Sequence, residues 1–443
     1  MGCTGRCSDT ADNAFLEGPR VHQEPRNEGK LTALDKGHGG PFSHYDVHGV
    51  VRIELGGPNA LLRQVLDRSL SHFRADGEGA DLSLNLGSYP SSDWTPRGST
   101  VGDRMLYDPE GRETTVFHKV MGNALVKGDV QYVIAGDPRV GTRPVTISVP
   151  SGPQEVSRFR KAAVEALDLE GRKAILALSG DPYFRAEKTE QDAEGILQTL
   201  LEPFLYYRLA ARGCSFVHGS GLSSNGSGFL IVGLASVGKT SLALEFVRKG
   251  YLYYGDDLPI VSEGGELLSN PKPIKLRSQH IKLYPDLASR LTSQMTGLER
   301  VLLTRKVRGH QPEFMKLLPR LSLEDIYEGV KIGDRVPLRT VIFLRRIAGK
   351  EVFIDEIDRE SVVKTVAADL FFQFPCAPFR RTMYYFCPSI ALGNDFMAEE
   401  DEHQRRITEI LTGAFSGARA VRLSVPMDYS FGDLQNQVSN LLS

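Results

Sequence analysis

The chain has 443 residues, of which 41% are hydrophobic and 24% carry a charged side chain. This composition is typical of a soluble globular protein that can bury a core, and the length allows two or three domains. The formal net charge of -2 gives no general attraction to nucleic acid or to an anionic membrane, so we expect neither as a partner.

The cysteines are odd in number and widely scattered, which argues against a disulfide framework and for reduced thiols. They are Cys3, Cys7, Cys214, Cys376 and Cys387. No run of eighteen apolar residues occurs, and no signal-peptide core follows the first methionine. We therefore expect a cytoplasmic protein.

The first part of the chain divides by composition. Residues 1–45 are polar without sustained periodicity and are predicted to be a disordered tail. Residues 46–150 are predicted to form a β-rich accessory domain with one helix at 61–73. Its strand-like runs are VHGVVRIEL, DLSLNL, TTVFHKV, VQYVIAG and RPVTISV.

Residues 151–214 are predicted to be a helical connecting region. Helical periodicity appears at 156–167 and again at 191–212, with the strand-like run AILALSG between them. Gly213 is predicted to end the second helix and to lead the chain into the next strand.

A glycine-rich segment follows the apolar run FLIV at 229–232. Gly233, Gly238, Lys239 and Thr240 satisfy the pattern G-x-x-x-x-G-K-[ST], and a helix-like run follows. The strand before and the helix after favour a phosphate-binding loop over the alternative, an ordinary glycine turn. The residues predicted to bind the nucleotide are Gly233, Leu234, Ala235, Ser236, Val237, Gly238, Lys239, Thr240 and Ser241.

The residue types explain the predicted chemistry. Glycines let the backbone turn its N–H groups inward, and the positive end of the helix dipole adds to their attraction for phosphate. Lys239 is predicted to reach the β- and γ-phosphates, and the Thr240 hydroxyl to ligate Mg²⁺. Arg248, Lys249 and Gly250 predict the end of the helix, with Gly250 as the residue after its cap.

Two acidic residues, Asp256 and Asp257, end a second apolar run that begins at residue 251. If this run lies as a parallel strand next to the strand at 229–232, both carboxylates emerge beside the phosphate loop. Acids there can hold Mg²⁺ or take a proton from an attacking hydroxyl. The alternative is that they satisfy N–H groups of a turn.

Counting residues along a predicted hairpin places a histidine, His218, beside the same loop. Asn225-Gly226 predicts a two-residue turn between apolar strands, and counting back along the ladder places His218 opposite Gly233. This register favours a functional histidine, although a lone histidine is more often structural.

These residues together carry a resemblance. His218-Gly219, the loop at 233–240, the step Arg248-Lys249-Gly250 and the pair Asp256-Asp257 resemble the catalytic core of the HPr kinase/phosphorylase family, bacterial protein-serine kinases related in fold to ATP-type phosphoenolpyruvate carboxykinases. The resemblance covers about forty residues. It implies a mixed α/β, P-loop nucleotide-binding core, a kinase domain at 215–443, and ATP and Mg²⁺ as cofactors.

The resemblance also implies roles for individual residues. Asp257 would accept the proton of the substrate hydroxyl, His218 would assist it, and Lys239 would neutralise the phosphates. Thr240 would be the metal ligand. Independently of the resemblance, the expected position of Asp256 beside the loop predicts it as a metal ligand too.

The chain departs from the family after the acid pair. The family has a glycine-rich segment there with a glutamate that completes the magnesium site, whereas this chain has NPKPIKLR at 270–277. The second metal ligand and the phosphorylase half-reaction are therefore not implied. An arginine that stabilises the migrating phosphoryl group is expected among Arg277, Arg308 and Arg339.

The rest of the C-terminal half alternates between strand and helix patterns. VPLRTVIFLRR at 336–346 and KEVFIDEI at 350–357 predict two strands joined by a turn around Gly349. AVRLSVP at 420–426 predicts a further strand, and residues 434–442 a final helix.

The function that fits these observations is ATP-dependent phosphorylation of a hydroxyl, with a serine of a protein or peptide as the expected acceptor. A small-molecule acceptor and a nucleotide-binding regulatory or scaffolding module without catalysis are the alternatives. The sequence leaves the oligomeric state open, including a homo-oligomer.

Overall fold

The structure is a computed structural model and has a mixed α/β architecture. It describes residues 42–57, 60–77, 79–86, 99–100, 105–107, 113–119, 129–135, 145–149, 196–274, 280, 284, 323–327, 329–373 and 396–442. Predictions for the tail up to residue 41, the helix at 156–167, the run AILALSG, Arg277 and Arg308 lie outside these residues.

The predicted strand-like runs of the N-terminal region lie in strands of the first sheet. The prediction that the tail extends to residue 45 is wrong, because residues 42–45 belong to a strand (Phe42–Val47) that pairs with the next one. In the described residues the strand order of the first sheet is β1-β2-β3-β8-β7-β6-β5-β4. Helix α1 (Ala60–Leu70) and a 3₁₀ turn (Ser71–Phe73) occupy the segment predicted to be helical. The strands are β1 (Phe42–Val47), β2 (Val51–Gly56), β3 (Leu82–Leu86), β4 (Ser99–Thr100), β5 (Met105–Tyr107), β6 (Glu113–Lys119), β7 (Asp129–Ala135) and β8 (Val145–Val149).

The second sheet holds the sequence motifs. Along the described strands its main order is β12-β10-β11-β15-β14-β13-β9, with β17 paired to β15 and β16 to β17. The strands are β9 (Cys214–Phe216), β10 (Gly219–Ser224), β11 (Ser227–Val232), β12 (Leu252–Asp257), β13 (Ile260–Ser262), β14 (Glu266–Leu268), β15 (Arg335–Ile347), β16 (Phe353–Glu356) and β17 (Arg419–Pro426).

Helices accompany this sheet on both faces. They are α5 (Glu202–Ala211), which follows a π-helical turn (Leu197–Leu201), α6 (Lys239–Arg248), α10 (Leu323–Ile326), α11 (Arg359–Gln373), α14 (Phe396–Phe415) and α15 (Phe431–Leu442). Over the residues that can be described, no helix combines the length and the apolar character that crossing a bilayer requires.

The hairpin between β10 and β11 has the predicted register. Asn225 (φ 50°) and Gly226 (φ 73°) both adopt positive φ, as a two-residue hairpin turn requires. Ser224 pairs with Ser227, and the ladder runs back to the pair Gly219 and Val232. The residue before Gly219 therefore reaches the end of β11, as the count from the turn predicted.

The position of β12 differs from the prediction. β12 does not lie next to β11, because β10 pairs antiparallel with both and separates them. The other edge of β11 is occupied by β15, which runs parallel to it. Since β11 and β12 are both antiparallel to β10, they run in the same direction and still end at the same edge of the sheet.

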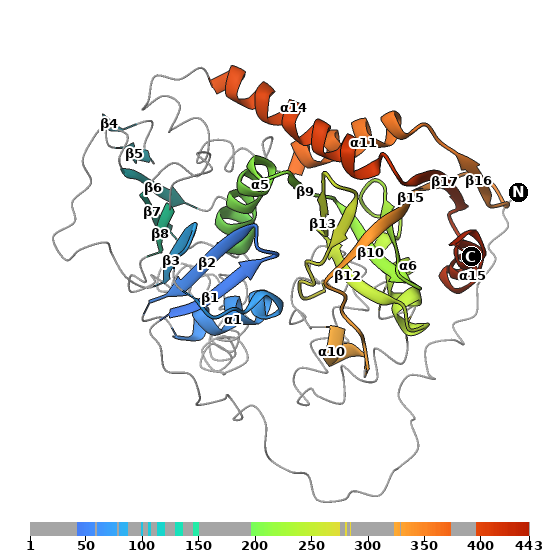
Figure 1. Cartoon of the computed structure of the whole chain (residues 1–443), viewed down its shortest axis with the longest axis horizontal. Helices are drawn as coiled ribbons and strands as arrows, with labels where there is room; N and C mark the ends of the chain where they lie inside the picture. The colour runs from blue at the N-terminus through green and yellow to red at the C-terminus, as the bar shows by residue number, and fades with distance from the viewer. Residues whose placement is uncertain are drawn as a thin grey trace, which may run out of the picture. The chain divides into compact units, whose positions relative to one another are not determined.

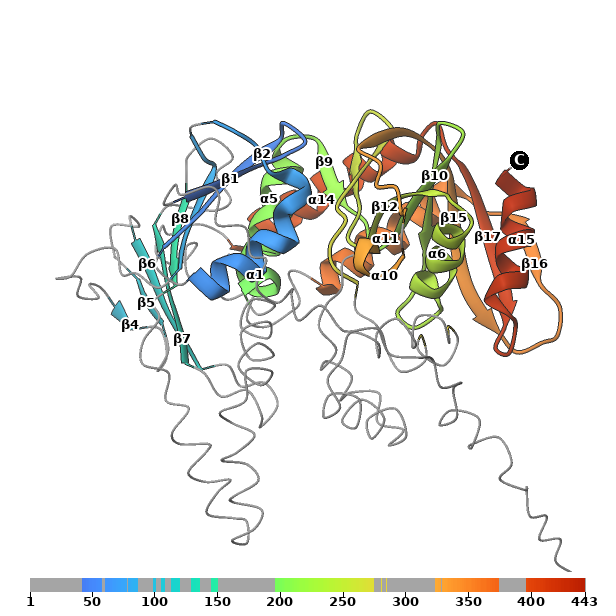
Figure 2. The same cartoon turned by 90° about the horizontal axis from the view of Figure 1, so that it is seen from below.

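The pleat of β11 divides the core into two layers. Leu230 and Val232 belong to a cluster that includes residues of α5, α11 and α14, and Phe229 and Ile231 to one with residues of α6 and α15. Figure 1 shows α11 and α14 as neighbouring helices, and Figure 2 shows α15 near α6. The second sheet is thus buried on both faces, which explains the continuous apolar run at 229–232.

The N-terminal strands contribute to the first of these clusters and make polar contacts with the second sheet. Arg212, after α5, forms an ion pair of 2.6 Å with Asp81. Two histidines contact Ser269: His48 Nε2 lies 2.7 Å from its carbonyl oxygen, and His72 Nε2 lies 2.7 Å from its hydroxyl. Strands β1–β3 therefore pack directly on the part of the chain that carries the motifs.

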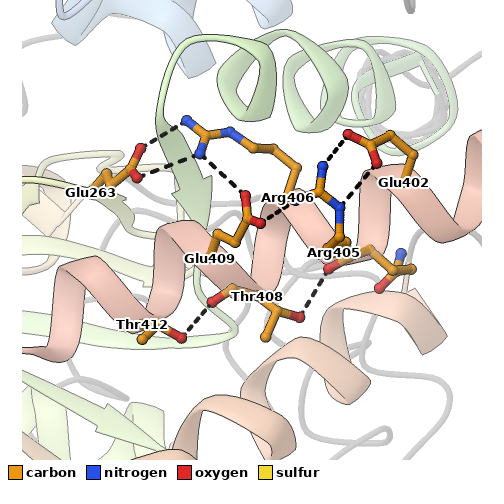
Figure 3. A network of polar contacts seen from close by, with 8 residues as sticks. Glu263, Glu402, Arg405, Arg406, Thr408, Glu409 and Thr412 are labelled. Atoms are coloured by element: carbon orange, nitrogen blue, oxygen red, sulfur yellow. Dashed lines mark hydrogen bonds and ion pairs between the residues drawn. The ribbon is translucent and has the colours of Figure 1, made fainter.

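Helix α14 is fixed to the turn between β13 and β14 (Figure 3). Arg406 donates to Glu263 at 2.7 Å, and a Cβ at Gly413 would lie 2.7 Å from the Glu263 carbonyl oxygen. Both charged groups are partly exposed, so the ion pair contributes about 0–1 kcal/mol. The close backbone approach therefore matters more than the charges for where α14 lies.

A substitution of Gly255 tests the packing around β12. Gly255 has φ 147°, and a Cβ would lie 2.7 Å from the Asn270 carbonyl oxygen. We expect Gly255→Ala to lower the free energy of unfolding by about 3 kcal/mol, combining left-handed strain with the clash. Gly250→Ala is the control, because Gly250 has φ 84° but open space around it. Gly250→Ala should lower the free energy of unfolding, measured in urea, by about 1 kcal/mol. Equal decreases for the two variants would contradict the packing argument.

His403 on α14 predicts a pH dependence. Its ring packs on Tyr206 and Tyr207 at centroid distances of 4.7 and 4.6 Å, and burial lowers its pKa to about 3. Below about pH 6.5 the unfolded chain therefore takes up a proton at this histidine that the folded chain does not. The free energy of unfolding should decrease as the pH is lowered, by up to about 1.4 kcal/mol per pH unit. His403→Phe should reduce this slope in urea unfolding at pH 7, 6 and 5. Parallel slopes for the two proteins would contradict it.

Candidate functional site

The glycine-rich loop connects β11 to α6 and has an unusual backbone. Gly233 (φ 149°), Ser236 (φ 64°) and Gly238 (φ 103°) all adopt positive φ. A Cβ at Gly233 would lie 2.3 Å from the Leu344 carbonyl oxygen, and one at Gly238 would lie 2.4 Å from the Phe431 ring. Both fixed glycines of the motif are therefore required by the fold itself.

Lys239 is the first residue of α6 and lies inside the loop that precedes it. Its side chain is 8% exposed, and Nζ donates to the carbonyl oxygens of Gly233 at 2.7 Å and Leu234 at 3.1 Å. The ammonium group is thus held at the N-terminal end of a helix, where free N–H groups and the helix dipole also favour an anion.

The other predicted loop residues differ in exposure. Leu234, Ala235 and Ser236 are exposed, and Leu234 is 62% exposed. Ser241 instead is 1% exposed, and its hydroxyl has no hydrogen-bond partner in the described part of the chain. Its carbonyl oxygen accepts from Tyr284. The outer surface of the loop is therefore open to solvent, and the Ser241 side chain points into the protein.

Asp256 joins β12 to the start of α6. Its carboxylate accepts hydrogen bonds from Thr240 Oγ1 at 2.7 Å and from the buried Ser220 hydroxyl. Burial raises the pKa of Asp256, and the two hydroxyl hydrogen bonds oppose this. The structure therefore brings together the two residues predicted to bind a metal.

Asp257 lies beside His218. The distance from Asp257 Oδ1 to His218 Nε2 is 3.7 Å, and the Asp257 side chain is 48% exposed. Asp257 has φ 79°, a conformation that is uncommon for residues other than glycine and that clusters at functional sites. His218 is fixed by its neighbours, since the Val217 N–H donates to the Pro259 carbonyl oxygen and Gly219 begins β10.

Asp369 on α11 is a second partner of His218 that the sequence did not predict. Its Oδ2 is hydrogen-bonded to His218 Nδ1 across 151 residues of chain. Its position depends on where α11 begins, and Asp358 caps that end by accepting from the Ser361 N–H at 2.9 Å. No local pattern in the sequence pairs these two residues.

Arg346 is a further residue of the site that the sequence did not predict. Its Nε donates to the Val237 carbonyl oxygen at 3.0 Å, and its Nη1 to that of Pro426 at 2.7 Å. The guanidinium lies 4.8 Å from the Phe431 ring centroid, and burial lowers its pKa. This arginine therefore braces the glycine-rich loop against the end of β17 and the start of α15.

Arg339, a predicted phosphoryl-stabilising arginine, lies elsewhere. It follows Leu338, which pairs with Gly228 at the start of β11, so it is at the end of the strand opposite the loop. The expectation that Arg339 joins the site is wrong, because β15 runs parallel to β11 and its carboxyl end, not its middle, meets the loop.

Residues 270–274, the described part of the run NPKPIKLR, make structural contacts. Asn270 is buried and its Nδ2 donates to the Leu258 carbonyl oxygen at 2.6 Å. Lys272 forms an ion pair with Glu202 at 2.8 Å. The first contact holds the residues that follow β14 near the acid-bearing end of β12, and the second joins them to the start of α5.

Comparisons with known proteins find little. No family model matches the sequence, and no curated protein matches it. Among solved structures, the HPr(Ser) kinase/phosphatase from Coxiella burnetii aligns with 10% sequence identity over 52% of this chain and 96% of its own length, with a TM-score of 0.21. A likeness of this size carries no inference about activity.

The brace formed by Arg346 gives a test of the loop. We expect Arg346→Met to lower the free energy of unfolding by about 2 kcal/mol, because two carbonyl groups lose their donors while the contact with Phe431 is kept. Arg339→Met on the same strand is the control, since Arg339 is exposed; it should change stability by less than about 0.5 kcal/mol. Equal effects in urea unfolding would contradict the brace.

Proposed function

We propose that this chain is an ATP-dependent kinase that transfers the γ-phosphoryl group to a hydroxyl, with a serine of a protein or peptide as the acceptor. The observation that carries the proposal is a convergence at one edge of the second sheet. The loop with Lys239, the pair of Asp256 and Thr240, and the pair of Asp257 and His218 all lie there.

The loop supplies what a triphosphate needs. Its glycines point backbone N–H groups toward a ligand, α6 presents its N-terminal end, and Lys239 adds a full positive charge. Lys239 would exchange its two carbonyl contacts for the β- and γ-phosphates. Because the protein itself forms no covalent bond with the transferred group, positioning and charge neutralisation would provide most of the catalysis.

The oxygen donors beside the loop fit Mg²⁺. Thr240 and Asp256 offer a hydroxyl and a carboxylate at hydrogen-bonding distance from each other. Mg²⁺ prefers such hard oxygen ligands and completes its shell with water and phosphate oxygens, so it needs few protein groups. The described residues contain no group of three or more histidine, cysteine or acidic side chains that could hold a metal ion. When bound, Mg²⁺ would neutralise charge on the phosphates.

Asp257 would act as the proton acceptor. Its exposed carboxylate would accept the proton of the acceptor hydroxyl as the oxygen attacks phosphorus. The exposure of Asp257 and of the loop tip at Leu234 favours an acceptor presented on a macromolecule over a small molecule enclosed in a pocket. This is why we propose a protein or peptide serine.

Asp257→Asn tests the proposal. We expect this variant to lose about 10²-fold or more in phosphoryl transfer, because the amide cannot accept the proton, while the dissociation constant for ATP changes little. Transfer from γ-labelled ATP to a lysate measures the first quantity, and calorimetric titration of ATP the second. Asp401→Asn, an exposed acid on α14, is the control and should leave both unchanged.

Lys239→Ala tests ATP binding separately from phosphoryl transfer. It should weaken ATP binding by about 10²-fold, because a buried ammonium group is lost from the phosphate site. If wild-type protein binds ATP but labels nothing, and Asp257→Asn behaves like wild type, the chain is a nucleotide-binding module and the kinase proposal fails.

A further inference from the structure

His218 lies between two carboxylates that belong to different elements. Its Nδ1 is hydrogen-bonded to Asp369 of α11, and its Nε2 lies 3.7 Å from Asp257 at the end of β12. The His218 side chain is 15% exposed and that of Asp369 is 23% exposed, so both are partly shielded from water.

The hydrogen bond determines which ring nitrogen carries the proton. A neutral imidazole has one N–H group, and an ionised carboxylate can only accept. Because the Asp369 carboxylate accepts the hydrogen bond at Nδ1, that nitrogen must be the donor. In the neutral ring, Nε2 then has a lone pair, which faces Asp257.

We propose that Asp369 is a positioning residue that fixes the tautomer and ring orientation of His218, so that Nε2 can take up the proton that Asp257 receives. This inference rests on the proposed kinase function. Asp369 would act only through the imidazole, to which it is hydrogen-bonded.

The step balances as follows for atoms and charge. The acceptor oxygen forms a bond to the γ-phosphorus, the bond from that phosphorus to the bridging oxygen breaks, and ADP leaves with the electron pair. The hydroxyl proton passes to Asp257 and then to His218 Nε2, which becomes an imidazolium and later releases the proton to water. The separation of 3.7 Å must shorten by about 0.7 Å, and such gaps are common before substrate binds.

A purely structural role, in which Asp369 anchors α11, is less well supported by the contacts. The helix already buries Val362, Val363, Val366 and Leu370, and its N-terminal end is capped by Asp358. These four side chains make buried apolar contacts, whereas Asp369 and His218 form a single, partly exposed polar pair that contributes less to docking. The docking of α11 therefore does not depend on Asp369.

A double-mutant cycle on the full chain tests the inference. Phosphoryl transfer is measured for wild type, His218→Ala, Asp369→Asn and the double variant. We expect about a 10²-fold lower kcat for His218→Ala, at least 10-fold for Asp369→Asn, and no further loss in the double variant. Losses that multiply would overturn the inference, because Asp369 would then act without His218.

The ring nitrogens of His218 give a readout that needs no activity. Nitrogen NMR of protein labelled at its ten histidines, with His218 assigned from the signal missing in His218→Ala, distinguishes the two tautomers at pH 9. We expect Nδ1–H in wild type and a shift toward Nε2–H in Asp369→Asn, because an amide can donate to Nδ1. Asp369→Glu restores a carboxylate and should restore Nδ1–H.

The controls separate the two proposals. Glu360→Gln, an exposed acid on the same helix, should change neither kcat nor the His218 signals. An unchanged tautomer in Asp369→Asn, or Nε2–H in wild type, overturns the positioning role. If wild type transfers no phosphate but the tautomer changes as expected, the kinase proposal fails and the role of Asp369 in orienting His218 stands.

Discussion

The structure depends on the antiparallel pairing of β10 with β11 on one side and β12 on the other. Gly219, the first residue of β10, faces Val232 and Asp257 in the two ladders. A Cβ at Gly219 would lie 2.6 Å from the Ile231 carbonyl oxygen, so only glycine allows this approach. The pairing aligns the ends of β11 and β12 with the start of β10, and the loop, the acids and His218 therefore meet at one edge.

The same edge gives two neighbouring acids different surroundings. Asp256 is bonded to Thr240 of α6, and Asp257 faces His218, which is bonded to α11, because successive residues of a strand point to opposite faces. Burial raises the pKa of the first, whereas the second is half exposed. One strand end thus presents a buried and an exposed carboxylate at successive positions.

Elements from the C-terminal half complete the site by packing against this edge. Phe431 at the start of α15 and Arg346 at the end of β15 close in on Gly238, and α11 delivers Asp369. Positive φ values at Ser236 and Asp257 are held within this frame. Such conformations cost about 1–3 kcal/mol each and persist only where surrounding contacts determine them.

The sequence by itself determined the local features: the glycine-rich loop, the register from Asn225-Gly226, the end of α6 shortly before Gly250 and most strands. These follow from residues a few positions apart, through turn chemistry and the periods of helix and strand. Only the tertiary structure decided that β10 lies between β11 and β12, that Arg346 rather than Arg339 reaches the loop, and that Asp369 meets His218. Each depends on which strand edge or helix face remains available after packing, and a contact across 151 residues leaves no periodic signal.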